Sequence, residues 1–191
     1  MVLTPDVAVV LVRHGETEWS SSGRHTSSTD IALTDVGREQ ARALAARLAG
    51  MDFTLVLTSP RRRARETCAL AGLPDRAEVT DDLAEWDYGD YEGRTTAEIR
   101  AEVPDWTIFT HGVPGGETTE QVAARADRVL ARAERVGGVV AMFSHGHFLR
   151  VLGARWIDLA ASDGALLGLD TATLSFLGRE REQHVLRVWN S

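Results

Sequence analysis

The stretch VVLVRHGETEW, residues 9–19, starts with four apolar residues and then turns abruptly to Arg13, His14 and Gly15. An apolar run without alternation is typical of a strand that is covered on both faces, as in a parallel sheet between layers of helices. In open sheets of this kind, ligands bind beyond the carboxyl ends of the strands. The stretch therefore predicts a buried strand that ends at a binding crevice, with Arg13 and His14 facing the ligand.

The composition is that of a globular protein with one domain of ordinary size: 191 residues, of which 43% are hydrophobic and 26% charged. The net charge of −7 argues against nucleic acid as a partner, so any anion site must be a local cluster. The apolar run at residues 7–12 is too short to cross a membrane, and no basic leader precedes it, so we expect no membrane contact. Cys68 is the only cysteine, which excludes an internal disulfide and favours a cytoplasmic protein.

The rest of the chain alternates between strand and helix patterns, without a repeat or a long linker. Thr34, Thr95 and Thr118 are placed to cap the N-termini of helices, and Ser59 to cap another that has Pro60 at its first position. Further strands are predicted over residues 55–58, 139–143, 171–178 and 184–189. This order predicts an α/β fold, a three-layer α/β/α sandwich with a largely parallel central sheet.

Three of these strands end in polar motifs, RHGET, TSPRRRAR and SHGH. A single histidine after a strand is commonly structural, but two histidines and a group of arginines at neighbouring strand ends favour a shared site. Successive helical residues are turned by about 100°, so at most two of Arg61, Arg62 and Arg63 can face one ligand. A helix that begins at Pro60 would also offer free N–H groups to a phosphate.

Five motifs follow one another along the chain: RHGETEW at 13–19, TSPRRRARET at 58–67, LAEWDYGDYEG at 83–93, PGGET at 114–118 and SHGH at 144–147. In this order they resemble the histidine phosphatase superfamily, in its phosphoglycerate-mutase-like branch, over residues 9–152. LTDVGREQA at 33–41 is similar to the family's first helix. The resemblance implies a single histidine phosphatase domain over residues 1–191 with a short cap-like insertion around 86–115, and it implies no cofactor and no metal.

The resemblance also implies catalytic roles. His14 would be the nucleophile and become phosphohistidine, which splits one hard displacement into two easier ones. Arg13, Arg63 and a cationic His145 would hold the phosphate and stabilise the charge of the transition state. Glu85 would stay protonated near the anion and give its proton to the leaving oxygen.

The substrate side of the site is less determined. By the same resemblance, the substrate-binding residues are Arg13, Ser20, Thr26, Arg63, Tyr88 and Gly146. Gly15 would let the backbone approach the anion closely. Large aromatic residues are more often core than pocket wall, which leaves open the roles of Trp19, Trp86, Tyr88 and Trp106. Two roles stay open for a further set of residues, which would either hold a second phosphate or simply lie on the surface: Arg24, His25, Arg94 and His111.

The predicted function is that of a phosphomonoesterase, which hydrolyses a small phosphorylated metabolite such as a sugar phosphate or bisphosphate through a phosphohistidine. TEWS, EWDYGDYEG and GETTEQ resemble the acid phosphatase and sedoheptulose-bisphosphatase-like members of the superfamily. The alternative is a cofactor-dependent phosphoglycerate mutase. Mutases generally carry a longer insertion after the acid residue, whereas only residues 86–114 lie between Glu85 and Gly115 here, so water should enter more easily. Ser20 and the segment GRHTSSTD also depart from the mutase pattern.

Two functions of other classes are weaker alternatives. A metal-dependent hydrolase would use His145 and His147 with carboxylates from residues 81–92, but a His-x-His pair is too small a ligand set, and the resemblance explains His145 without a metal. A non-catalytic phosphate-binding protein would not need the complete set of catalytic residues. We expect a small phosphorylated substrate as the partner, and a homodimer is compatible with the sequence.

Overall fold

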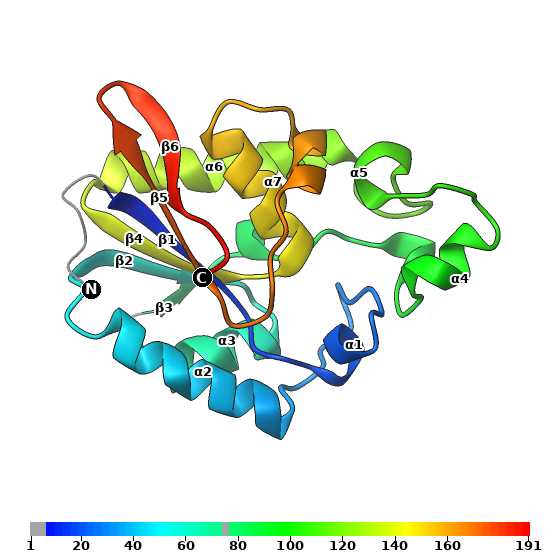
Figure 1. The fold of residues 1–191 in the computed structure, drawn as a ribbon, viewed down its shortest axis with the longest axis horizontal. Coiled ribbons are helices and arrows are strands. Elements are labelled where there is room, and N and C mark those ends of the chain that lie inside the picture. The colour runs from blue at the N-terminus through cyan, green and yellow to red at the C-terminus, as the bar shows by residue number, and fades with distance from the viewer. Residues whose placement is uncertain (1–6, 74–76) are drawn as a thin grey trace.

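The computed structural model describes residues 7–73 and 77–191 (Figure 1). Its elements, with η for a 3₁₀ helix, are β1 (Val7–Arg13), α1 (Glu18–Ser21), α2 (Asp35–Leu48), β2 (Phe53–Thr58), α3 (Arg62–Leu70), β3 (Ala77–Val79), η2 (Asp81–Leu83), η3 (Gly89–Tyr91), α4 (Thr96–Arg100), α5 (Ile108–His111), α6 (Thr119–Val136), β4 (Val139–Ser144), α7 (Gly146–Trp156), η4 (Ala161–Leu166), β5 (Leu174–Glu180) and β6 (Gln183–Val188).

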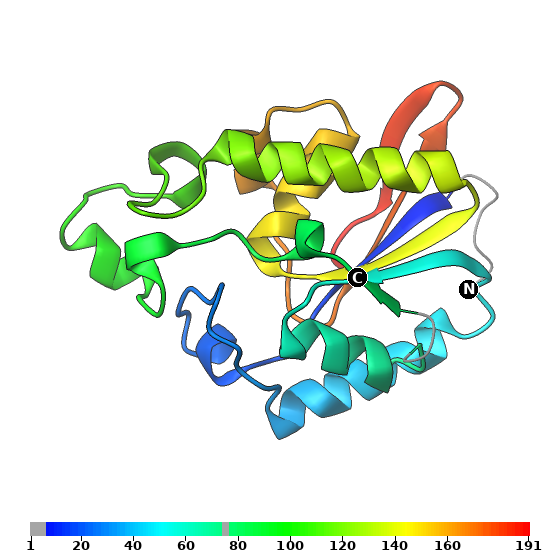
Figure 2. The same ribbon diagram turned by 180° about the vertical axis from the view of Figure 1, so that it is seen from behind.

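The strands form one sheet in the order β3-β2-β4-β1-β5-β6. The first four strands are parallel to one another, β5 is antiparallel to β1, and β6 is antiparallel to β5. Helices α2 and α3 lie on one side of the sheet, and α6 and α7 lie on the other (Figures 1 and 2). The predicted three-layer α/β/α fold with a largely parallel sheet is therefore confirmed.

The first strand is covered on both faces, as its apolar run predicts. Val9 and Leu11 belong to the core cluster that includes residues of α6 and α7. Val10 and Val12 belong to the cluster that includes residues of α2. Because side chains of a strand alternate between faces, an uninterrupted apolar run supplies both cores at once.

The predicted helix starts are confirmed at three of four places. Thr34 caps α2 by accepting the Gly37 N–H, and the Thr95 and Thr118 capping boxes are present. The fourth prediction is wrong, because α3 begins at Arg62 and not at Pro60. The Ser59 hydroxyl bonds instead to the N–H of Arg61 at 3.2 Å and to a histidine of the site described below.

The segment 86–115, which we predict to be a cap-like insertion, contains η3, α4 and α5. These helices extend beyond the sheet at the same end of the molecule as α1 (Figure 1). The segment is tied to the loop after α1, since the His25 N–H bonds to the Arg94 carbonyl oxygen at 2.9 Å and the Gly93 N–H to that of His25 at 2.8 Å. None of the helices within the described ranges is long and apolar enough to span a bilayer.

Candidate active site

The polar motifs of β1, β2 and β4 lie side by side, because these three strands are neighbours in the sheet and run parallel. A cavity of about 180 Å³ opens at this edge. Its lining consists of Arg13, His14, Ser20, Gly23, Arg24, His25, Thr26, Glu85, Tyr88, Gly146, His147, Arg150 and Leu169. The fold thus brings seven of the nine predicted site residues to the cavity wall, while Arg63 and His145 do not line it and are fully buried.

His14 follows directly after β1 and borders the cavity, with only 6% of its surface exposed. Its Nδ1 donates a hydrogen bond to the Gly15 carbonyl oxygen at 2.7 Å, because a carbonyl oxygen can only accept. Burial, and then the charges of Arg63 and Arg13, lower the pKa of His14 well below its ordinary value. The imidazole is therefore neutral at neutral pH, with its proton on Nδ1 and a lone pair on Nε2.

The backbone around Gly15 is held by α2 and α3. Thr67 Oγ1 accepts the Gly15 N–H at 3.1 Å, and Gln40 Oε1 accepts the Glu16 N–H at 2.9 Å. A Cβ atom on Gly15 would overlap the carbonyl oxygen of Gly37. Gly15 therefore allows close packing on α2, and its role in letting the backbone approach an anion stays a prediction.

Arg13 is one of the three arginines that line the cavity. One of its terminal nitrogens donates to the Leu169 carbonyl oxygen, and its buried Nε has no hydrogen-bond partner among the described residues. Burial is the main cause that lowers its pKa. Gly146 leaves room for this side chain, since a Cβ at that position would lie 3.3 Å from Arg13 Cζ. An unpaired donor at a cavity wall can bind an anion at little further desolvation cost.

Arg63 and His145 form a buried pair behind the cavity. Arg63 Nε donates to His145 Nδ1 at 3.1 Å, so the ring proton is on Nε2, which donates to Ser59 Oγ at 2.7 Å. Burial, and then Arg63, lower the pKa of His145 well below its ordinary value. His145 is therefore neutral in this structure, and its cationic form next to a bound phosphate stays a prediction. The terminal nitrogens of Arg63 donate to the carbonyl oxygens of Thr26 at 2.9 Å and Thr29 at 3.2 Å, which braces the loop beside the cavity.

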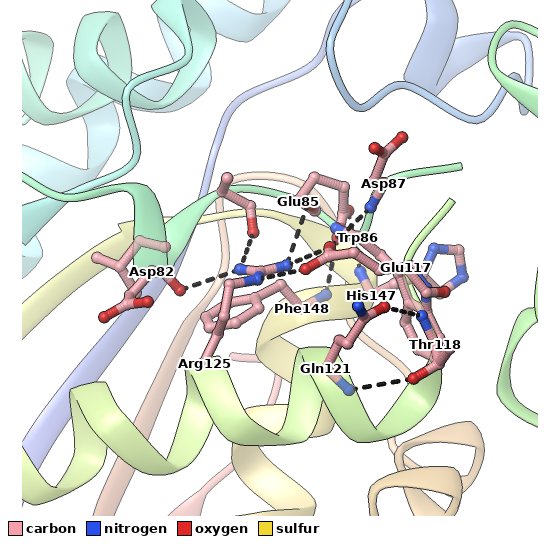
Figure 3. A network of polar contacts seen from close by, with 12 residues as sticks. Asp82, Glu85, Trp86, Asp87, Glu117, Thr118, Gln121, Arg125, His147 and Phe148 are labelled. Carbon is pink, nitrogen blue, oxygen red and sulfur yellow. Dashed lines mark hydrogen bonds and ion pairs between the residues drawn. The ribbon is translucent and has the colours of Figure 1, made fainter. Parts of the chain in front are cut away.

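Glu85 follows η2 in the chain, and its side chain points to the first turn of α7 (Figure 3). Only 7% of its surface is exposed. Oε1 accepts the N–H groups of Trp86 at 2.9 Å and Phe148 at 2.8 Å, and Oε2 accepts that of His147 at 3.1 Å. The N–H groups of a first helical turn have no partner within the helix, so they are natural ligands of a carboxylate. This arrangement fixes the carboxylate at the cavity wall.

One wall of the cavity is aromatic and uncharged. The Tyr88 hydroxyl and His147 Nδ1 are 2.6 Å apart, and the ring centroids of Tyr88 and His25 are 4.8 Å apart. Burial lowers the pKa of His25 to about 4 and that of His147 well below its ordinary value, and it raises the pKa of Tyr88. All three side chains are therefore neutral at neutral pH, and the cations that line the cavity are Arg13, Arg24 and Arg150.

Ser20 and Thr26, which we predict to bind substrate, reach the cavity wall, but both hydroxyls already have protein partners. Ser20 Oγ bonds to the N–H of Thr17 at 2.8 Å and to its carbonyl oxygen at 3.0 Å in the capping box of α1. Thr26 Oγ1 donates to the Arg24 carbonyl oxygen at 3.2 Å. Their role in binding substrate stays a prediction.

The aromatic and basic residues whose role the sequence left open lie partly at the cavity and partly elsewhere in the molecule. Of the four aromatic residues, only Tyr88 lines the cavity, while Trp86 and Trp106 belong to the core. Arg24 and His25 line the cavity as well. Arg94 instead pairs with Glu102 at 2.5 Å, and His111 lies at the exposed end of α5.

The histidines of SHGH do not act together. His145 contacts Arg63 and Ser59, whereas His147 contacts Tyr88. In the ranges that the structure describes, no group of three or more His, Cys, Asp or Glu residues could hold a metal ion.

Sequence reasoning missed His147, Arg150 and Leu169 as residues of the cavity wall. Arg150 follows His147 by three residues, about one turn of α7, so helical spacing alone could have placed it at the same edge. Leu169 contributes its main-chain oxygen to Arg13. Every residue has such an oxygen, so no sequence signal could have found it.

Comparison with known proteins agrees with this geometry. The profile of the histidine phosphatase superfamily (branch 1) matches residues 9–191. An acid phosphatase of Mycobacterium tuberculosis is 47% identical, with 94% of this chain and 90% of the relative covered. A sedoheptulose 1,7-bisphosphatase of Saccharomyces cerevisiae is 37% identical (82% and 69% covered), and a phosphoglycerate mutase of a Methylobacterium species is 36% identical (75% and 77%).

A solved structure of a Mycobacterium tuberculosis protein superimposes with a TM-score of 0.91 at 44% identity and covers 95% of this chain and 96% of its own. These comparisons support the phosphomonoesterase activity that the motifs predict. The order of the motifs, the sheet and the profile match over nearly the whole length lead to one conclusion: the chain belongs to branch 1 of the histidine phosphatase superfamily.

Proposed function

We propose that the protein is a phosphomonoesterase that hydrolyses small phosphorylated metabolites through a phosphohistidine at His14. One observation carries the proposal: His14 stands at the cavity wall as a neutral imidazole whose Nδ1 proton is bound by the Gly15 carbonyl oxygen. The Nε2 lone pair is then available for attack. Because burial and two arginines lower the pKa of His14, this nitrogen is unprotonated at neutral pH.

The proposed reaction has two displacements. Nε2 of His14 attacks phosphorus, the bond from phosphorus to the leaving oxygen breaks, and Glu85 gives that oxygen a proton. Water then attacks phosphohistidine, Glu85 takes a proton from it, and inorganic phosphate leaves with the His14 ring restored. Arg13, whose buried Nε has no hydrogen-bond partner among the described residues, would bind the phosphate oxygens, and Arg63 would add positive charge from behind the cavity.

The charges of the cavity wall suit a substrate that carries one or more phosphate groups. Arg24 and Arg150 line the cavity in addition to Arg13, and the neighbouring histidines are neutral. We therefore propose a sugar phosphate or bisphosphate as the substrate class. A phosphoglycerate mutase is the second candidate, since a relative with that name is 36% identical. The short segment between Glu85 and Gly115 favours hydrolysis over transfer, because less of the chain is available to exclude water.

A substrate panel tests this proposal. Purified protein would be assayed with sugar phosphates, bisphosphates and phosphoglycerates, with a chelator present throughout. We expect inorganic phosphate to appear in step with the dephosphorylated product, and rapid quench with radiolabelled substrate to trap acid-labile, base-stable phosphate on the protein. Interconversion of the phosphoglycerate isomers with little free phosphate would favour the mutase instead.

Compartment and assembly stay predictions. A single cysteine that is buried, Cys68, suits a reducing compartment such as the cytoplasm. A homodimer is compatible with the fold, and its mass in solution would test it.

A further inference from the structure

Figure 3 shows Arg125 reaching from α6 to the segment that carries Glu85. Arg125 does not line the cavity. Its side chain is only 12% exposed. Nε and one terminal nitrogen donate to the two carboxylate oxygens of Glu117, at 2.8 and 2.7 Å. The remaining donors bond to main-chain carbonyl oxygens of Asp82 at 3.1 Å, Ala84 at 2.9 Å and Glu85 at 3.4 Å. All five N–H donors of the guanidinium are therefore used.

Glu117 continues this network on the other side of Glu85. Its Oε2 accepts the Asp87 N–H at 3.0 Å, and its own N–H donates to the Asp87 carbonyl oxygen at 3.1 Å. Its carbonyl oxygen accepts Nε1 of Trp86 at 2.9 Å. The Arg125–Glu117 pair therefore holds the backbone before Glu85 and the two residues after it.

The same guanidinium also contacts α7. Its Cζ lies 4.7 Å from the ring centroid of Phe148, and the Phe148 N–H donates to Glu85 Oε1 at 2.8 Å. Arg125 thus links α6 with both residues 82–87 around Glu85, the acid segment, and the helical turn that binds the Glu85 carboxylate. The bonds of Arg125 itself go to Glu117 and to main-chain oxygens, and none of them is to the His14 ring or to the carboxyl group of Glu85.

We propose that Arg125, acting through the acid segment and Glu117, is a positioning residue that sets the location of the Glu85 carboxyl group for proton transfer. The inference rests on the proposed acid role of Glu85. A planar guanidinium can serve five acceptors in fixed directions, whereas a lysine has three donors at one point and cannot reproduce them. A displacement of about 1 Å at a reacting group can cost on the order of 10²-fold in rate, so loss of this network should be visible in kinetics.

The test compares leaving groups in the Arg125→Lys variant. An alkyl leaving oxygen needs a proton, whereas p-nitrophenolate departs readily without one. We expect kcat/KM for a sugar phosphate to fall by about 10-fold to 10²-fold and that for p-nitrophenyl phosphate by less than about threefold. The matched control is Arg128→Ala, which removes the more exposed Arg128–Asp82 ion pair from the same helix and segment. That variant should resemble the wild type with both substrates.

Two further variants make the test independent of any single one. In a Glu85→Gln background, Arg125→Lys should cause no further loss with the sugar phosphate, because the group that it positions is already inactive. Glu117→Gln weakens the same network from the other partner and should show the same leaving-group selectivity. It carries the test if Arg125→Lys fails to fold.

The outcomes separate this inference from the proposed function. Equal losses with both substrates, or losses that add to those of Glu85→Gln, would show that Arg125 is merely structural and overturn the inference alone. If Glu85→Gln itself lacks leaving-group selectivity, the acid role of Glu85 falls, and the positioning role of Arg125 falls with it.

Discussion

The two groups proposed to react, His14 and Glu85, are held in place in different ways. The ring of His14 is oriented by the carbonyl oxygen of the next residue, Gly15. The carboxylate of Glu85 accepts the N–H of the next residue, Trp86, but it also depends on two N–H groups of α7, more than sixty residues further along the chain, and its backbone depends on Arg125 of α6. A nucleophile oriented by its own backbone should be insensitive to changes in α6, whereas the acid should not be. Substitutions can therefore weaken attack by His14 and proton transfer by Glu85 separately.

The largest effect is expected for His14→Ala. This change removes the nucleophile, so turnover should be lost with every substrate, whatever its leaving group. We expect kcat to fall by about 10⁴-fold or more, the scale seen when a catalytic nucleophile is deleted. Rates with a sugar phosphate and with p-nitrophenyl phosphate would be measured together with the thermal midpoint, which should change little. Turnover within about tenfold of the wild type in a folded variant would remove the covalent mechanism.

A smaller effect is expected for Arg63→Ala, which should weaken catalysis with both kinds of leaving group. Arg63 holds His145 and braces the loop at Thr26, so its loss should lower kcat/KM by about 10²-fold with either leaving group. Arg62→Ala is the control, because Arg62 is exposed and only approaches Glu66 at 3.7 Å. Steady-state kinetics of the two variants decide this point. A larger loss in Arg62→Ala would mean that the arginine facing the site has been wrongly assigned.

The smallest effect is expected for Gln40→Ala, the counterpart of Arg125→Lys on the nucleophile side. Gln40 accepts the Glu16 N–H and so holds the peptide group whose carbonyl orients His14. Loss of one such bond, about 1 kcal/mol, corresponds to roughly a fivefold fall in kcat/KM. The fall should be equal for both leaving groups, and Gln40→Glu, which retains an acceptor, should restore much of it. A loss confined to the sugar phosphate would contradict the separation of the two sides.

The motifs could predict where the site lies because they act through local rules. An apolar run followed by Arg13 and His14 indicated a buried strand and its functional end, and neighbouring parallel strands necessarily bring their carboxyl ends together. The capping boxes at Thr95 and Thr118 were predictable for the same reason, since both partners lie within four residues.

Most of the errors and omissions concern contacts between distant segments. The Ser59 hydroxyl was expected to cap α3, but it bonds to His145, a residue that approaches it only when β2 and β4 pair. The charge of His145 also depends on distant neighbours, because burial and Arg63 lower its pKa in the absence of a phosphate. A charge state depends on desolvation and on neighbours that the sequence does not place.

By itself, the sequence determined the α/β class, the family and the identity of the proposed nucleophile, because hydrophobic patterning and short motifs are properties of adjacent residues. Only the tertiary structure decided which residues line the cavity, which histidines are neutral and how Glu85 is held. Arg125 illustrates the reason: it belongs to no motif, and its five donors find their acceptors only when α6 packs against the acid segment. Desolvation and the direction of hydrogen bonds depend on what surrounds a group in space, and that information arises when the chain folds.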